Sequence, residues 1–158
     1  QLGIEDTDKG HDLNMKIVQA DIDLMKKCDA GIFCLDSLRR GPAMDPGTAV
    51  EIGYMIALGK PMAGWSGDIR PYPQRVAEYF RDAFGEELKK TDIKVQGSTT
   101  GVLRDPDGIL VHSEGMLQNL MTHGGIELVG GKVYADKNWE TAFEKAVISL
   151  AGQLNISG

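Results

Sequence analysis

Three acidic residues, Asp21, Asp45 and Glu51, are the side chains whose types and spacing could do chemistry. We expect Glu51 in the first turn of a helix, where the helix dipole favours a carboxylate and keeps it ionised. An ionised glutamate held in one place can act as a nucleophile. A first-turn glutamate can also serve only to cap its helix, and its position alone favours this second interpretation.

The elements that position Glu51 form a strand, helix, strand unit over residues 29–65. An apolar strand over residues 31–36 is followed by a loop, a helix and a second strand. Ligands of open α/β sheets bind at the carboxyl ends of parallel strands, which is where we expect residues 36–51. Gly47 would let the backbone approach a ligand closely, and Thr48 would cap the helix through its hydroxyl group.

Asp21 lies inside the apolar stripe of a predicted helix over residues 13–28. The apolar positions of this stripe recur at helical spacing; they are Ile17, Val18, Leu24, Met25 and Cys28. A carboxylate directed toward the core is costly without a partner, so Asp21 is either functional or bonded to a neighbouring backbone amide. The residues alone favour neither interpretation. Asp23 falls on the polar face, where we expect it to be solvated.

Residues 45–61 read Asp-Pro-Gly-Thr-Ala-Val-Glu-Ile-Gly-Tyr-Met-Ile-Ala-Leu-Gly-Lys-Pro. This segment resembles the signature of the nucleoside 2-deoxyribosyltransferase family. In that signature an Asp lies six residues before a Glu, the Glu is followed by an apolar residue and Gly, and the helix ends in Gly-Lys-Pro. The resemblance extends backward through Asp21 and Asp29 and forward to Asn119-Leu120-Met121.

The resemblance implies the catalytic roles. Glu51 would be the nucleophile that forms a covalent glycosyl-enzyme intermediate. Asp21, eight residues before Asp29, would be the catalytic acid that protonates the leaving base and later activates the acceptor. Family members also begin with a strand and a Gly-Pro-rich turn carrying an aromatic residue, and no such segment precedes Gln1. We therefore expect either a truncated form of the chain or a site that is built differently at this point.

The resemblance also implies the binding residues. Asp45, Gly47 and Thr48 would bind substrate, and Asp45 would hold a sugar hydroxyl group or the base. Asn119 would bind the sugar 5′-hydroxyl group in the active site of a neighbouring subunit, accompanied by Met121. The implied partners are a deoxynucleoside and a free nucleobase, in a homo-oligomer with shared active sites and without a cofactor.

The chain as a whole reads as one domain over residues 1–158, with an ordinary globular composition of 42% hydrophobic and 25% charged residues. The net charge of −6 argues against nucleic acid as a partner. Two cysteines, no signal peptide and no long apolar run indicate a cytoplasmic protein without membrane association. The histidines lack metal-ligand spacing, so we expect no metal; they are His11, His112 and His123.

The order of elements predicts a flavodoxin-like or Rossmann-like α/β sandwich with a mostly parallel sheet. No Gly-x-Gly-x-x-Gly follows a strand, so a nicotinamide or flavin has no support. Helices are expected over residues 74–90, 114–121 and 139–154, the last capped by Asp136 or Asn138. Residues 126–134 would form a hairpin or a short terminal strand, and residues 91–113 an irregular excursion.

Residues in two loops, both expected at the carboxyl ends of the strands, leave more than one function open. Arg39 and Arg40 could recognise a 5′-phosphate through their guanidinium groups. Tyr72 or Trp65 could stack on a base, although an aromatic residue beside a strand end is more often ordinary packing. Asp36 could face the ligand or bind backbone in the loop. The candidate functions are therefore a deoxyribosyl transferase, a nucleoside or nucleoside 5′-monophosphate N-glycoside hydrolase, and a non-catalytic nucleoside-binding module.

Overall fold

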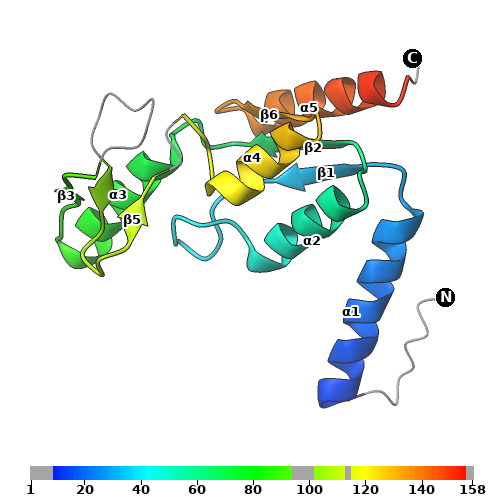
Figure 1. Cartoon of the computed structure of the whole chain (residues 1–158), viewed down its shortest axis with the longest axis horizontal. Helices are drawn as coiled ribbons and strands as arrows, with labels where there is room; N and C mark the ends of the chain where they lie inside the picture. The colour runs from blue at the N-terminus through cyan, green and yellow to red at the C-terminus, as the bar shows by residue number, and fades with distance from the viewer. Residues whose placement is uncertain (1–8, 94–101, 113–114, 156–158) are drawn as a thin grey trace.

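A parallel sheet lies at the centre of the computed structural model, which describes residues 9–93, 102–112 and 115–155. Three strands form this sheet within the described residues. They are, in spatial order, β1 (Gly31–Cys34), β2 (Met62–Ser66) and β6 (Lys132–Ala135). Gly31 pairs with Met62 in one ladder, and Ala63 pairs with Lys132 in the other. The carboxyl ends of the strands therefore share one edge of the sheet, on the left in Figure 1.

Helices cover both faces of the sheet (Figure 1). One face packs against α2 (Pro46–Ala57) and α4 (Leu120–Leu128), and the other against α5 (Trp139–Gln153). The core between the sheet, α2 and α4 is apolar; its buried residues are Phe33, Leu35, Met44, Ile52, Met55, Met62 and Ile126. The predicted α/β sandwich with a parallel sheet is confirmed.

The N-terminal helix α1 (Gly10–Lys27) extends away from this body (Figure 1). Its stripe was expected to be buried, and that prediction is wrong for the single chain. Four of its apolar side chains are largely exposed; they are Met15, Ile17, Val18 and Leu24. Ala20 is buried, and Met25 packs against the core. Because the sheet lies only at the C-terminal end of the helix, the rest of the stripe faces solvent.

The helix expected over residues 74–90 is α3 (Tyr72–Phe84), which ends earlier than predicted. Gly85 adopts a φ of 68°, and its N–H donates to the carbonyl of Arg81 at 3.0 Å. A left-handed glycine of this kind terminates a helix. A small antiparallel sheet follows. Its first strand lies at the end of the expected helix, and its other two strands lie where an irregular excursion was expected. Its strands are β3 (Lys89–Lys90), β4 (Leu103–Arg104) and β5 (Leu110–Val111); residues 94–101 and 113 of the excursion lie outside the described residues.

Two predictions near the C-terminus are also corrected. The helix expected over residues 114–121 instead starts at Leu120, because Asn119 caps it by accepting the Met121 N–H at 2.9 Å. Residues 126–134 do not form a hairpin. They contain the end of α4 followed by β6, and β6 is the short strand that was predicted as the alternative to a hairpin. The closing helix α5 is confirmed, with Asn138 as its cap.

Candidate active site

Asp45 caps the helix that carries Glu51. Its carboxylate oxygen Oδ2 accepts the backbone N–H of Thr48 at 2.8 Å and the Thr48 hydroxyl at 3.4 Å. The prediction that Thr48 caps this helix is therefore wrong, because Thr48 is the donor. A Cβ atom at Gly47 would lie 2.8 Å from the same Oδ2. Gly47 thus leaves room for the Asp45 carboxylate at the start of α2.

Glu51 is the sixth residue of α2 and lies in its second turn, not the first turn that was expected. The helix dipole acts mainly on the first turn, so it does not hold Glu51 ionised as predicted. The structure gives the opposite direction: burial raises the pKa of Glu51, and the negative charges of Asp21 and Asp45 raise the pKa further. The three acidic residues singled out in the sequence therefore share one electrostatic neighbourhood.

Asp21 is exposed on α1, so the prediction that its carboxylate points toward the core is wrong within the single chain. Its charge still reaches Glu51 on α2, since it contributes to the raised pKa of that residue. Asp23 accepts hydrogen bonds from Gln19 and Lys26, both at 3.1 Å. Asp23 is thus engaged along its own helix, and Asp21 is the acidic residue of α1 that acts on Glu51.

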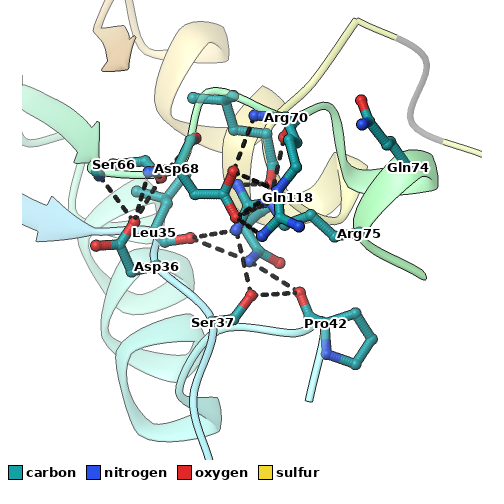
Figure 2. A network of polar contacts seen from close by, with 12 residues as sticks. Leu35, Asp36, Ser37, Pro42, Ser66, Asp68, Arg70, Gln74, Arg75 and Gln118 are labelled. Carbon is teal, nitrogen blue, oxygen red and sulfur yellow. Dashed lines mark hydrogen bonds and ion pairs between the residues drawn. The ribbon is translucent and has the colours of Figure 1, made fainter. Parts of the chain in front are cut away.

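A network of polar contacts ties together the loops at the carboxyl ends of β1 and β2 (Figure 2). Asp36 accepts the Ser66 hydroxyl at 2.6 Å and the Gly67 N–H at 2.9 Å. Of the two roles considered for Asp36, the structure shows the one in which it binds backbone. The Asp36 carboxylate therefore joins the carboxyl ends of β1 and β2.

Arg75 on α3 is the centre of this network, and its side chain is only 2% exposed. Its guanidinium donates to the carbonyls of Leu35 at 3.3 Å, Arg70 at 3.1 Å and Leu117, and it lies 3.6 Å from the Asp68 carboxylate. Burial lowers the pKa of Arg75, while the negative charge of Asp68 acts in the opposite direction. Sequence reasoning missed Arg75, because a single arginine in an amphipathic helix reads as part of its charged face.

Gln118 completes the network from the segment before α4. Its Nε2 donates to the Leu35 carbonyl at 3.0 Å and to the Pro42 carbonyl at 3.3 Å, while its buried Oε1 has no partner among the described residues. Sequence reasoning missed Gln118 as well. Its neighbour Asn119 uses Oδ1 as the cap of α4. The Asn119 amide is thereby held in one orientation relative to the β1 edge.

Asn119 and Met121 lie at the start of α4, the helix that packs against α2. Asn119 is exposed, and 70% of Met121 is accessible. Asn119 lines a cavity of about 250 Å³ together with Tyr72, Tyr79 and other apolar residues of α3 and β5. Both predicted sugar-binding residues are therefore accessible at the start of α4, and Asn119 lines a cavity.

A second cavity, of about 490 Å³, lies beside the β1–α2 loop. Arg40 and Arg75 line it, and so do the acidic residues Asp68, Glu78 and Asp82. Glu51 lines neither cavity.

Of the two aromatic residues proposed to stack on a base, Trp65 is ordinary packing. Its ring lies 5.8 Å from that of Trp139 and 5.7 Å from that of Phe143, on the α5 face of the sheet. Tyr72 lines the cavity of about 250 Å³, and burial raises the pKa of its phenol. Tyr72 thus remains available for an aromatic ligand.

The described residues contain no group of three or more side chains that could hold a metal ion. Within the same part of the chain, no helix is long and apolar enough to cross a membrane. The candidate catalytic groups are therefore the carboxylates of Asp21, Asp45 and Glu51.

Most enzymes that hydrolyse glycosidic bonds use a pair of Asp or Glu side chains that flank the bond. Comparison with known proteins gives the family within this class. The family model described as nucleoside 2-deoxyribosyltransferase matches residues 2–121, and the chain belongs to this family. The matched segment includes Asp21, Asp45, Glu51 and Asn119, so the resemblance inferred from the sequence is confirmed.

Two similar proteins bear on this assignment. An uncharacterised protein of Schizosaccharomyces pombe is 48% identical over 155 residues, which are 98% of this chain and 72% of that protein. A solved 2-desoxiribosyltransferase from Leishmania mexicana superposes with a TM-score of 0.51 at 27% identity, covering 91% of this chain and 72% of that one. The fold is therefore that of a deoxyribosyltransferase.

Proposed function

We propose that this protein transfers a 2-deoxyribosyl group between nucleobases by double displacement. The observation that carries the proposal is the electrostatic coupling of Glu51 to Asp21 and Asp45 inside the segment that matches the family. A glutamate whose pKa is raised is a stronger base once ionised, and hence a better nucleophile. Above that pKa, Glu51 is charged and ready to attack the anomeric carbon.

The reaction proceeds in two steps. The Glu51 carboxylate forms a bond to the anomeric carbon while the bond to the base nitrogen breaks. In the reactive form the single proton of the Glu51–Asp21 pair lies on Asp21, which gives it to the departing base. A second base then attacks the glycosyl ester, loses its proton to Asp21 and releases Glu51. Two inversions at one carbon retain the original configuration. Asp45, with Gly47 and Thr48 at the start of α2, binds the sugar hydroxyl group or base beside Glu51.

Product analysis tests this function. The protein is incubated with a deoxynucleoside, with and without a second free base, and the products are identified by chromatography. A new nucleoside supports transfer, free sugar alone supports a hydrolase, and absence of turnover supports a binding module. Glu51→Ala should abolish turnover, whereas Glu144→Ala on the exposed surface of α5 should not. Near-native activity of Glu51→Ala would remove Glu51 from the mechanism.

The leaving group tests Asp21. Asp21→Asn should slow nucleosides with poor leaving groups far more than those with activated leaving groups, because only the former need protonation. Asp45→Ala should instead weaken binding of all substrates. Equal slowing of both substrate types by Asp21→Asn would show that Asp21 is not the acid.

We further propose a homo-oligomer in which Asn119 and Met121 complete the pocket of a neighbouring subunit. The support is that α1, which carries Asp21, exposes an apolar stripe, and that Asn119 and Met121 are exposed in one chain. Asn119→Asp keeps the oxygen that caps α4 and removes the amide donor. Mixing this variant with Glu51→Ala under subunit exchange should restore activity. No recovery despite proven exchange would contradict shared sites.

An N-glycoside hydrolase acting on nucleoside 5′-monophosphates is the second candidate. Ser37 and Arg40 line the cavity of about 490 Å³ and could supply a hydroxyl and a guanidinium to a 5′-phosphate. The same cavity is lined by as many acidic as basic side chains; they are Asp68, Glu78 and Asp82, and Arg40, Arg70 and Arg75. Arg70 is already paired with Asp68 and Glu78. The lining therefore has no excess of positive charge to attract a phosphate, and the transferase remains the first proposal.

A further inference from the structure

The turn Gly59-Lys60-Pro61 that ends α2 contacts three elements, which are α2, β1 and α1. Gly59 adopts a φ of 64°, and its N–H donates to the Ile56 carbonyl at 2.9 Å, which closes α2. The Pro61 carbonyl accepts the N–H of Gly31 at 3.0 Å, where β1 starts. The backbone of this turn therefore connects the end of α2 to the beginning of the sheet.

The Lys60 side chain connects this turn to α1. Its Nζ donates to the carbonyls of Met25 at 2.9 Å, Lys26 at 2.6 Å and Cys28. An ammonium group has three donors, and here all three are directed at carbonyls of the α1 C-terminus. That end of a helix carries unpaired carbonyls and the negative pole of the dipole, which a cation stabilises.

Much of the apolar face of α1 is left uncovered by the described residues. Met25 packs against the core, while Met15, Val18 and Leu24 are about half exposed, and Figure 1 shows the helix leaving the body beyond its last turn. Asp21 lies five residues before Lys26, which is about 7.5 Å along the helix axis. A tilt of about 10° at the last turn would move Asp21 by roughly 1 Å on this length. The orientation of the last turn therefore decides where Asp21 stands relative to α2.

We propose that Lys60 is a positioning residue that anchors the C-terminus of α1 and thereby fixes Asp21 against Glu51. The structural part of the inference, that Lys60 anchors α1, rests on the three carbonyl contacts. The catalytic part, that this placement of Asp21 matters for the reaction, rests on the proposed function. Lys60 follows the helix that carries Glu51, so a single side chain sets the relation between the nucleophile and the acid.

The test compares Lys60→Met with Lys27→Met. Lys60→Met keeps most of the apolar stem and loses all three donors, whereas Lys27→Met removes a positive charge from an exposed position at the same helix end. A displacement of about 1 Å can cost on the order of a hundredfold in rate. Lys60→Met should therefore slow nucleosides with poor leaving groups by about ten- to a hundredfold, and slow activated ones much less. Lys27→Met should change neither rate appreciably.

Two further variants separate positioning from simple loss of structure. Adding Lys60→Met to Asp21→Asn should cause little extra loss, because the acid that Lys60 positions is already gone. Lys60→Arg, which keeps donors directed at the carbonyls, should recover part of the activity. If Lys60→Met slows both substrate types by the same factor, Lys60 does not act through Asp21 and the inference is overturned.

Hydrogen exchange gives a readout that does not depend on catalysis. The amides of the last turn of α1 should exchange faster in Lys60→Met than in the unmodified protein or in Lys27→Met. Unchanged exchange overturns the inference, whatever the activity. If the unmodified protein shows no N-glycoside chemistry, the proposed function fails on its own terms, while faster exchange in Lys60→Met still establishes the anchor.

Discussion

Replacing Arg75 by methionine should destabilise the protein strongly, although Arg75 belongs to none of the sequence motifs. Its guanidinium is buried and donates to the carbonyls of Leu35, Arg70 and Leu117. Methionine fills a similar volume without any donor. The Leu35 carbonyl keeps its bond from Gln118, and Asp68 keeps its ion pair with Arg70. The loss therefore falls mainly on the other two carbonyls.

The magnitude follows from these two carbonyls. A buried acceptor that loses its donor costs about 1–3 kcal/mol, and burying an uncharged side chain instead of a guanidinium recovers part of that. We therefore expect Arg75→Met to lower the free energy of unfolding by about 3 kcal/mol. For a chain of this size, that corresponds to a fall in Tm of about 6–12 °C.

The assay is thermal unfolding followed by circular dichroism, with Arg81→Met as the matched control. Arg81 lies on the same helix, is exposed, and pairs with its neighbour Asp82 at 2.8 Å. Such surface pairs contribute about 0–1 kcal/mol, so Tm should change by no more than about 4 °C. If Arg75→Met and Arg81→Met unfold at the same temperature, Arg75 does not hold the loops together and this reasoning is refuted.

Three further predictions concern stability. Asp36→Ala should cost about 2 kcal/mol, because two bonds to the β2–α3 turn lose their charged acceptor, and urea unfolding measures it. Gly131→Ala should be strongly destabilising in thermal unfolding, since a Cβ atom would overlap the Met62 carbonyl oxygen, whereas Gly152→Ala in open space on α5 should stabilise by about 0.5–1 kcal/mol. Glu51→Gln should raise Tm at pH 7 and not near pH 3. The folded pKa of Glu51 is raised, so the unmodified protein loses stability as pH rises from the ordinary glutamate value through that raised pKa.

The sequence contained enough to predict the local elements around Glu51. Apolar periodicity and the turn residues gave the strand, helix, strand unit, which the structure has as β1, α2 and β2. The cap was assigned to Thr48 because both Thr48 and Asp45 are residues of the capping type. Pro46 was the signal that could have decided, since proline favours the first helical position and therefore makes Asp45 the cap.

Other features depend on contacts that no local pattern encodes. Gln118 reaches Leu35 across 83 residues of sequence, and Arg75 reaches it across 40. The apolar stripe of α1 is a second example. An apolar pattern predicts which face of a helix avoids water, but it does not predict whether the same chain covers that face. Lys60 belongs to a recognisable motif, yet its contact with the α1 carbonyls appears only once α1 and α2 are placed side by side.

The most direct measurement of the central claim is to trap the glycosyl-enzyme. The protein is mixed with a deoxynucleoside in the absence of acceptor base, quenched rapidly in acid, digested and mapped by peptide mass spectrometry, with Glu51→Gln in parallel. The account predicts a 2-deoxyribosyl adduct on the peptide of α2 that contains Glu51, and none in the variant. Turnover without any adduct on that peptide, or an adduct on another carboxylate, would contradict it.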